Sequence, residues 1–182
     1  MPEVLIDRDA LALRVRELAA AIERDSSGPE PPHCVAVLKG AFVFLADLVR
    51  AFRGPVTCDF LGVSSYGSGT AFSGEVRVTQ DLSQAIAGRD VVLVEDIVDS
   101  GRTLAYLQQL LLAREPRSLR TVCLLDKPGR REVEARVEYV GFEIPDRFVV
   151  GYGLDLDERY RNLPYVATIS NVDLPERLRA HA

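Results

Sequence analysis

Short apolar runs alternate with amphipathic stretches along most of the chain. Residues 7–24 carry apolar side chains at helical spacing, with Asp7 or Asp9 as the N-cap, whereas residues 33–38, HCVAVL, form a short apolar run typical of a buried strand. The same patterns predict helices at 7–24, 41–52 and 104–114 and strands at 33–38, 56–63, 75–79, 90–94, 119–125, 137–140, 148–151 and 165–169. This alternation predicts an α/β fold with a mostly parallel sheet covered on both faces, in a single domain of residues 1–182.

One segment interrupts the pattern. Residues 64–74, SSYGSGTAFSG, consist largely of Gly, Ser and Thr, have no apolar periodicity and lie between two predicted strands. That composition is typical of a mobile loop, and loops of this kind commonly carry functional groups.

Composition and charge narrow the class of partner. The chain has 182 residues and a net charge of −5, so no basic field exists to follow a nucleic-acid backbone, and we expect no nucleic-acid partner. The first ten residues lack a signal-peptide pattern, and the apolar stretch 41–49 is too short to span a bilayer, so we expect no membrane association. Cys34, Cys58 and Cys123 each lie in an apolar run, which predicts buried free thiols and a cytoplasmic location.

Candidate chemistry concentrates in residues 91–103, VVLVEDIVDSGRT, where a predicted strand leads through a loop into a helix. Ligands of open α/β sheets bind beyond the carboxyl ends of the strands. The start of a helix leaves backbone N–H groups unpaired, Gly101 allows close approach of a ligand, and Ser100 and Thr103 add hydroxyl donors. Together with the helix dipole, these groups predict a phosphate-binding loop.

Three acidic residues lie beside this loop, and phosphate binding alone does not explain their presence. Glu95 and Asp96 directly follow the predicted strand, and Asp99 opens the loop, so a phosphate would be repelled unless a cation offsets the charge. Mg²⁺ does so, and ribose hydroxyls also accept carboxylates as partners. The alternative is that Asp99 or Ser100 is a plain N-cap and the acids are solvated, which leaves three acids in five residues without a use. Neither G-x-x-x-x-G-K-[ST] nor G-x-G-x-x-G is present.

This segment resembles the signature of the type I phosphoribosyltransferases, specifically their hypoxanthine-guanine branch. Further segments resemble that family in the same order between about residue 37 and residue 169: the pyrophosphate loop at 37–41, the lid with Ser65 and Tyr66, the strand end 124–127, the purine-pocket segment 140–155, and Arg161 in ERYRNLP. The resemblance implies a central sheet flanked by helices, with a small hood, a flexible lid and a cis peptide bond between Leu38 and Lys39.

The resemblance also implies an activity: Mg²⁺-dependent transfer of a 5-phosphoribosyl group from phosphoribosyl pyrophosphate to hypoxanthine or guanine, which yields IMP or GMP and pyrophosphate in purine salvage. It assigns the donor to Lys39, Gly40 and Arg161 at the pyrophosphate, Glu95 and Asp96 at the ribose, and Ser100, Gly101, Arg102 and Thr103 at the 5′-phosphate. It assigns the base to Lys127 at the 6-oxo group, Phe148 by stacking and Val149 through its backbone. The implied magnesium ligands are Glu95, Asp96 and Asp155, and the implied general base near purine N7 is Asp99.

Lys127 carries the expected specificity, because an ammonium group has only donors and so favours a 6-oxo over a 6-amino purine. Taken alone, Lys127 fits a solvated turn better than a base contact, and Phe148 fits core packing equally well. Asp155 and Arg161 also fit a solvated loop, and only the order of these residues relative to the signature favours the functional interpretation. Arg102 stands where the family varies, and either an outward orientation or a pyrophosphate contact fits it.

Two other functions compete with this one. A regulatory relative that keeps the donor site but binds nucleic acid is disfavoured by the acidic charge. A pyrimidine or adenine phosphoribosyltransferase is disfavoured by Lys127 and the segment 142–155. The family further implies a homodimer or homotetramer.

Overall fold

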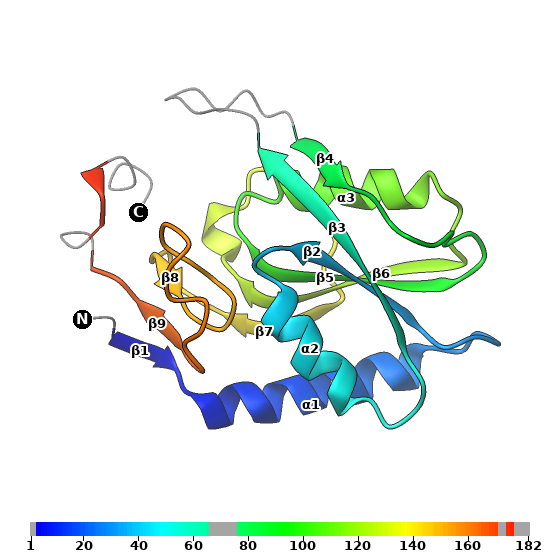
Figure 1. The fold of residues 1–182 in the computed structure, drawn as a ribbon, viewed down its shortest axis with the longest axis horizontal. Helices are drawn as coiled ribbons and strands as arrows, with labels where there is room; N and C mark the ends of the chain where they lie inside the picture. Colours follow the sequence, from blue (N-terminus) through cyan, green and yellow to red (C-terminus); the bar gives the residue numbers. More distant parts are fainter. Residues whose placement is uncertain (1–2, 66–75, 171–173, 177–182) are drawn as a thin grey trace.

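The computed structural model describes residues 3–65, 76–170 and 174–176. The helices of these residues are α1 (Arg8–Asp25), α2 (Phe42–Ala51) and α3 (Arg102–Leu112), with a short 3-10 turn at Pro128–Arg130 (Figure 1). The strands are β1 (Glu3–Ile6), β2 (His33–Leu38), β3 (Thr57–Ser65), β4 (Val76–Gln80), β5 (Asp90–Val98), β6 (Ser118–Asp126), β7 (Tyr139–Glu143), β8 (Val149–Val150) and β9 (Val166–Thr168).

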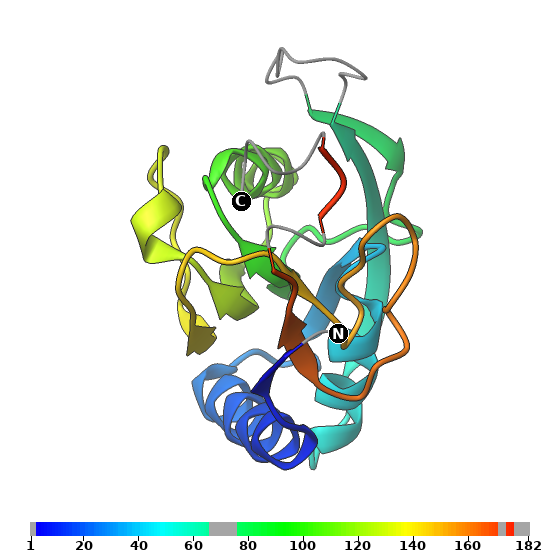
Figure 2. The same cartoon turned by 90° about the vertical axis from the view of Figure 1, so that its left-hand side faces the viewer.

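Six strands form the main sheet in the order β4-β3-β2-β5-β6-β7. The five strands from β3 to β7 in that order are parallel, and only the edge strand β4 is antiparallel. Helices α1 and α2 cover one face of the sheet and α3 covers the other (Figures 1 and 2). The predicted α/β fold with a mostly parallel, doubly covered sheet is therefore confirmed.

The apolar side chains of β5 point to both faces of the sheet, which explains why helices cover both faces. Val92 and Val94 pack with the α1 and α2 side chains, whereas Val91 and Leu93 pack with those of α3. A strand that is buried on both faces needs apolar residues at every position, which is why this segment has an unbroken apolar run rather than an alternating pattern.

A second, antiparallel sheet has the order β1-β9-β8. Figure 1 places it on the side toward which the parallel strands run, so it lies near their carboxyl ends and corresponds to the expected hood. Strand β1 was not predicted, because two of its four residues are exposed and its pairing partner, β9, is more than 150 residues away in sequence.

Three local predictions need correction or restriction. Strand β5 does not end before Glu95 but continues to Val98, because β6 pairs with it as far as Val98↔Asp126 and so satisfies the backbone of the acidic stretch. Cys58 is exposed rather than buried, since it lies near the start of β3, where β4 does not extend. Of the predicted mobile loop, the first two residues belong to β3, and 66–74 lie outside the described residues.

The capping of α1 is settled in favour of Asp7, whose carboxylate accepts a hydrogen bond of 2.8 Å from the Ala10 backbone N–H. In the described parts of the chain, no helix combines the length and the apolar character that a bilayer crossing would need.

Leu93 tests the importance of the doubly covered strand. Its side chain is fully buried on the α3 side of the sheet, whereas Leu112, at the end of α3, is 56% exposed. We expect Leu93→Ala to lower the free energy of unfolding by roughly 2–5 kcal/mol, and the matched control Leu112→Ala to change it by less than about 0.5 kcal/mol. Urea unfolding curves of both variants measure this, and equal losses would contradict the assigned core.

Candidate active site

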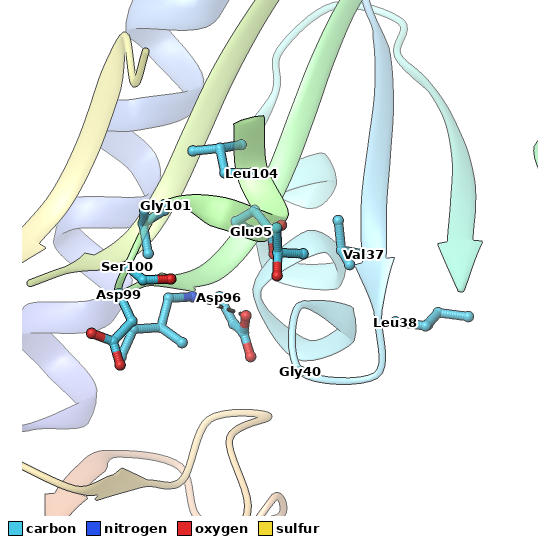
Figure 3. A pocket seen from close by; sticks show the side chains of 12 residues that line it. Val37, Leu38, Gly40, Glu95, Asp96, Asp99, Ser100, Gly101 and Leu104 are labelled. Carbon is cyan, nitrogen blue, oxygen red and sulfur yellow. Dashed lines mark hydrogen bonds between the residues drawn. The ribbon is translucent and has the colours of Figure 1, made fainter. Parts of the chain in front are cut away.

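A cavity of about 270 Å³ opens at the carboxyl ends of β2 and β5, where ligands of this sheet type were expected (Figure 3). Its walls come from the end of β2, the end of β5, the following loop and the start of α3. The lining residues are Val37, Leu38, Gly40, Glu95, Asp96, Ile97, Val98, Asp99, Ser100, Gly101, Thr103 and Leu104. The structure therefore brings together most of the residues that were expected to hold the ribose and the 5′-phosphate.

Glu95 and Asp96 give the cavity its electrostatic character. Successive side chains of a strand point to opposite faces, yet both line this cavity because it is bounded by the whole end of β5. Burial raises the pKa of Glu95 well above its usual range, and the neighbouring Asp96 carboxylate raises it further. Burial also raises the pKa of Asp96, to about 6, although the Ile97 N–H and the Arg161 guanidinium oppose the rise. The cavity floor therefore carries two carboxyl groups that lack enough compensating positive charge.

Gly40 closes the wall opposite these acids. A Cβ atom at Gly40 would overlap the carboxylate of Asp96, and a Cβ atom at Gly153 would overlap the carbonyl oxygen of Gly40. Gly153 also has a φ of +103°, a conformation that favours glycine. The backbone at residue 40 is thus held between Asp96 and the loop after β8, and one residue earlier the Leu38–Lys39 peptide bond is cis as expected.

The loop 99–101 is fixed from outside the cavity. Gly101 is left-handed, with φ +84°, and a Cβ there would lie 2.6 Å from the carbonyl oxygen of Val133. The Ser100 carbonyl oxygen accepts hydrogen bonds from the backbone N–H groups of Glu132 and Val133, at 2.9 and 3.1 Å. The loop that leads into α3 is therefore already held in place. A fixed loop together with the unpaired N–H groups of the first turn of α3 suits the binding of a phosphate.

Arg102 does not line this cavity. Its guanidinium pairs with Glu132 at 2.7 Å, and both side chains are more than half exposed. In this arrangement Arg102 is oriented toward Glu132, and its contact with a 5′-phosphate stays a prediction.

The residues expected at the pyrophosphate lie together beside the cavity. Arg161 donates to the Gly153 carbonyl oxygen at 2.7 Å and pairs with Asp155 at 2.9 Å. Lys39 pairs with Glu158 at 3.1 Å, and Glu158 also reaches Arg161 at 3.3 Å. Both cations that were assigned to pyrophosphate are therefore neutralised by acids of the loop 155–158.

The residues expected to bind the purine do not line this cavity. The Lys127 side chain is largely buried, and its backbone N–H donates to the Val98 carbonyl oxygen at 3.0 Å, which places it next to the end of β5. Val149 is buried in β8, and Phe148 packs partly against an apolar cluster that includes Val150 and Ile169. Ser65 is the last residue of β3, and Tyr66 lies outside the described residues.

Sequence reasoning missed several residues of this region. Gly153 shapes the wall at Gly40, Glu158 neutralises Lys39, and Arg130 and Asp146 contact Asp99 and Lys127. Arg130 and Asp146 lie in the segments DKPGRR and IPDRF, whose clustered charges were visible in the sequence but had no assigned partner.

The carboxylates assigned to magnesium provide only part of a metal-binding site. Within the described ranges, no three His, Cys, Asp or Glu side chains form a ready metal-binding cluster. Asp155, the third assigned ligand, pairs instead with Arg161. Mg²⁺ usually keeps several waters and takes one or two carboxylates together with substrate phosphates. Glu95 and Asp96, whose pKa values are raised mainly by burial, match that kind of site.

Gly40 provides a steric test of the cavity. We expect Gly40→Ala to displace the Asp96 carboxylate and to weaken binding of phosphoribosyl pyrophosphate by roughly 10–100-fold, which corresponds to the loss of about 1–3 kcal/mol when a buried polar group loses its partner. Calorimetric titration measures the affinity. Gly54→Ala is the matched control, because its Cβ would meet only an ordinary contact with Glu23. Equal affinities for both variants would contradict the proposed wall.

The raised pKa of Asp96 provides a pH test. A carboxyl group with a raised folded-state pKa stabilises the fold while it is protonated, and this contribution is lost as the pH rises through that pKa. For Asp96 the window extends from its ordinary value of 3.8 to about 6. Without Mg²⁺, we therefore expect the thermal midpoint of the wild type to fall relative to that of Asp96→Asn between about pH 4 and pH 6. Parallel curves over that window would show that Asp96 is not in an uncompensated site.

Comparisons with known proteins agree with this geometry. The family model of the phosphoribosyl transferase domain matches residues 5–157. The hypoxanthine phosphoribosyltransferase of Salmonella typhimurium is 47% identical over 172 residues, which cover 94% of this chain and 97% of that protein. A crystal structure of a hypoxanthine-guanine phosphoribosyltransferase from Bacillus anthracis has a TM-score of 0.88 at 48% identity and covers 93% of this chain and 99% of that one.

One further relative is much longer. The bifunctional protein TilS/HprT of Listeria monocytogenes is 49% identical over 167 residues, so this chain is matched over 92% of its length but spans only 26% of the relative. Because the family model and the full-length relatives both cover most of the sequence, the chain belongs to the phosphoribosyltransferase family of glycosyl-type transferases, within its hypoxanthine and hypoxanthine-guanine branch.

Proposed function

We propose that this protein is a purine-salvage enzyme that transfers the 5-phosphoribosyl group of phosphoribosyl pyrophosphate to hypoxanthine or guanine in a Mg²⁺-dependent reaction. The observation that carries the proposal is the cavity in which the adjacent acids Glu95 and Asp96 lie directly beside the loop 99–103 at the start of α3. A ligand that fits it needs a phosphate at one end and a polyhydroxyl or metal-bound group at the other. A ribose 5-phosphate with a pyrophosphate at C1′ meets both needs.

On the donor side, the chain provides binding and charge. The N–H groups and hydroxyls of Ser100, Gly101 and Thr103 would hold the 5′-phosphate, and Glu95 and Asp96 would hold the ribose hydroxyls and, with Asp155, the shell of a magnesium ion. When bound, magnesium supplies positive charge to the pyrophosphate. Lys39 and Arg161 would exchange their contacts with Glu158 and Asp155 for the pyrophosphate oxygens.

On the acceptor side, the chain would accept one proton from the purine and donate a hydrogen bond to its 6-oxo oxygen. The bond between C1′ and the pyrophosphate oxygen breaks, pyrophosphate leaves with the electron pair, and N9 of the purine bonds to C1′. The purine loses a proton, which Asp99 would accept at N7. Lys127 would donate to the 6-oxo oxygen, Phe148 would stack on the ring and Val149 would offer its backbone to the base edge. Ser65 and Tyr66 would belong to a lid that excludes water from the reacting carbon.

The remaining assignments follow the same proposal. The competing role as a nucleic-acid-binding regulator is disfavoured by the net charge of −5. The buried thiols of Cys34 and Cys123 are consistent with a cytoplasmic location. A homodimer or homotetramer is proposed from the family alone.

A base panel tests the function. With Mg²⁺ and phosphoribosyl pyrophosphate, we expect pyrophosphate release with hypoxanthine or guanine and little with adenine, because a 6-amino group leaves Lys127 without an acceptor. Omission of Mg²⁺ should abolish release. Asp99→Asn should lower kcat by roughly 10²–10⁴, the usual effect of losing a general base. Absence of release with every 6-oxopurine would refute the activity, and an unchanged kcat for Asp99→Asn would remove Asp99 from its role.

A further inference from the structure

Four charged side chains of alternating sign connect the proposed general base to the proposed base-reading lysine. Arg130 Nε donates to Asp99 Oδ1 at 3.2 Å, and Arg130 Nη1 donates to Asp146 Oδ2 at 3.1 Å. The other oxygen of Asp146, Oδ1, lies 3.5 Å from Lys127 Nζ. The order along this chain of contacts is therefore Asp99, Arg130, Asp146, Lys127, with two acids and two bases.

The backbone around these four residues is firmly held. The Lys127 N–H donates to Val98, the Arg130 N–H donates to Lys127, and the Ile144 N–H donates to Asp126, at 2.9–3.0 Å. The neighbouring Arg131 also donates to the Asp99 carbonyl oxygen at 3.2 Å. The loop after β5, the turn after β6 and the segment before β8 are thereby joined into one frame, so the side-chain contacts connect parts of the chain that are already fixed relative to one another.

The chemistry of a purine explains why such a connection is useful. N7 and the 6-oxo oxygen lie on the same edge of the base, so the group that handles the N7 proton and the group that donates to the oxygen must meet at that edge. Lys127 has three N–H donors, and its contact with Asp146 engages one of them. Arg130 engages only one of the two Asp99 carboxylate oxygens, among the contacts of the described residues.

We propose that Arg130 and Asp146 are positioning residues for this reaction: Arg130 orients the Asp99 carboxylate toward N7, and Asp146 orients the Lys127 ammonium toward the 6-oxo oxygen of the base. This inference rests on the proposed function, because it assumes the roles given to Asp99 and Lys127. Neither residue is expected to matter for stability, since the Arg130 and Asp146 side chains are 35% and 44% exposed and exposed ion pairs stabilise little.

Steady-state kinetics with varied purine and varied phosphoribosyl pyrophosphate separate the two roles. We expect Arg130→Ala to lower kcat by roughly 10–100-fold, with Arg130→Lys recovering part of the loss because it retains the charge without the fork. We expect Asp146→Asn to raise the KM for hypoxanthine by roughly tenfold and to leave the KM for phosphoribosyl pyrophosphate unchanged. In the Asp99→Asn background, Arg130→Ala should cause little further loss, because it acts through Asp99.

Arg114→Ala is the matched control. Arg114 forms an ion pair with Asp81 of similar exposure at the far end of α3, and its loss should leave both constants unchanged. If Arg130→Ala does not fold, as judged by its thermal midpoint, Arg130→Lys and the nearly isosteric Asp146→Asn carry the test. Arg130 and Asp146 variants that behave like Arg114→Ala would overturn this inference alone, provided that Asp99→Asn and Lys127→Gln are impaired. Unimpaired Asp99→Asn and Lys127→Gln would instead overturn the roles on which it rests.

Discussion

The placement of two adjacent carboxyl groups at the end of β5, the buried Glu95 and the half-buried Asp96, is the constraint on which the rest of the site depends. Burial raises the pKa of both, and among the described residues neither forms an ion pair. The backbone beneath them is secured by pairing between β5 and β6, which continues past both acids to Val98. The fold therefore supplies the rigidity, and the compensating charge has to come from a ligand.

This constraint extends to neighbouring segments. Residue 40 has no room for a side chain because the Asp96 carboxylate occupies that space, and residue 153 has none because the carbonyl oxygen of residue 40 does. The loop after β8 is thus packed onto the cavity wall, and it carries Asp155 and Arg161 with it. The Asp96 carboxylate on the central strand β5 in this way fixes the position of Arg161, more than 60 residues later in the chain.

The cations assigned to the site are each paired with an acid of the same chain. Lys39 contacts Glu158, Arg161 contacts Asp155, and Lys127 contacts Asp146. Under the proposed function, such pairing would explain how a chain with a net charge of −5 holds a polyanionic donor, because local cations would exchange an internal acid for a substrate oxygen. The affinity for the donor would then be a difference between two sets of ion pairs rather than the sum of the new contacts.

Much of the fold follows from sequence patterns that are local. The helices and buried strands of the main sheet were predictable because apolar periodicity within each segment determines which face is covered. The features that escaped prediction depend on distant partners: β1 forms only against β9, the extension of β5 only against β6, and the exposure of Cys58 follows from where β4 ends. The same holds for the site, where the signature loop was readable, whereas the contacts of Arg130, Asp146 and Glu158 arise only after folding.

Calorimetric titration of phosphoribosyl pyrophosphate at about pH 6, with and without Mg²⁺ and in two buffers of different protonation enthalpy, tests the central claim most directly. The site with Glu95 and Asp96 should bind the donor tightly only with Mg²⁺ and should release protons as it does so, and Asp96→Asn should reduce that release. Equal affinity without Mg²⁺, together with no difference in proton release between wild type and Asp96→Asn, would contradict the claim that these two acids require a cation.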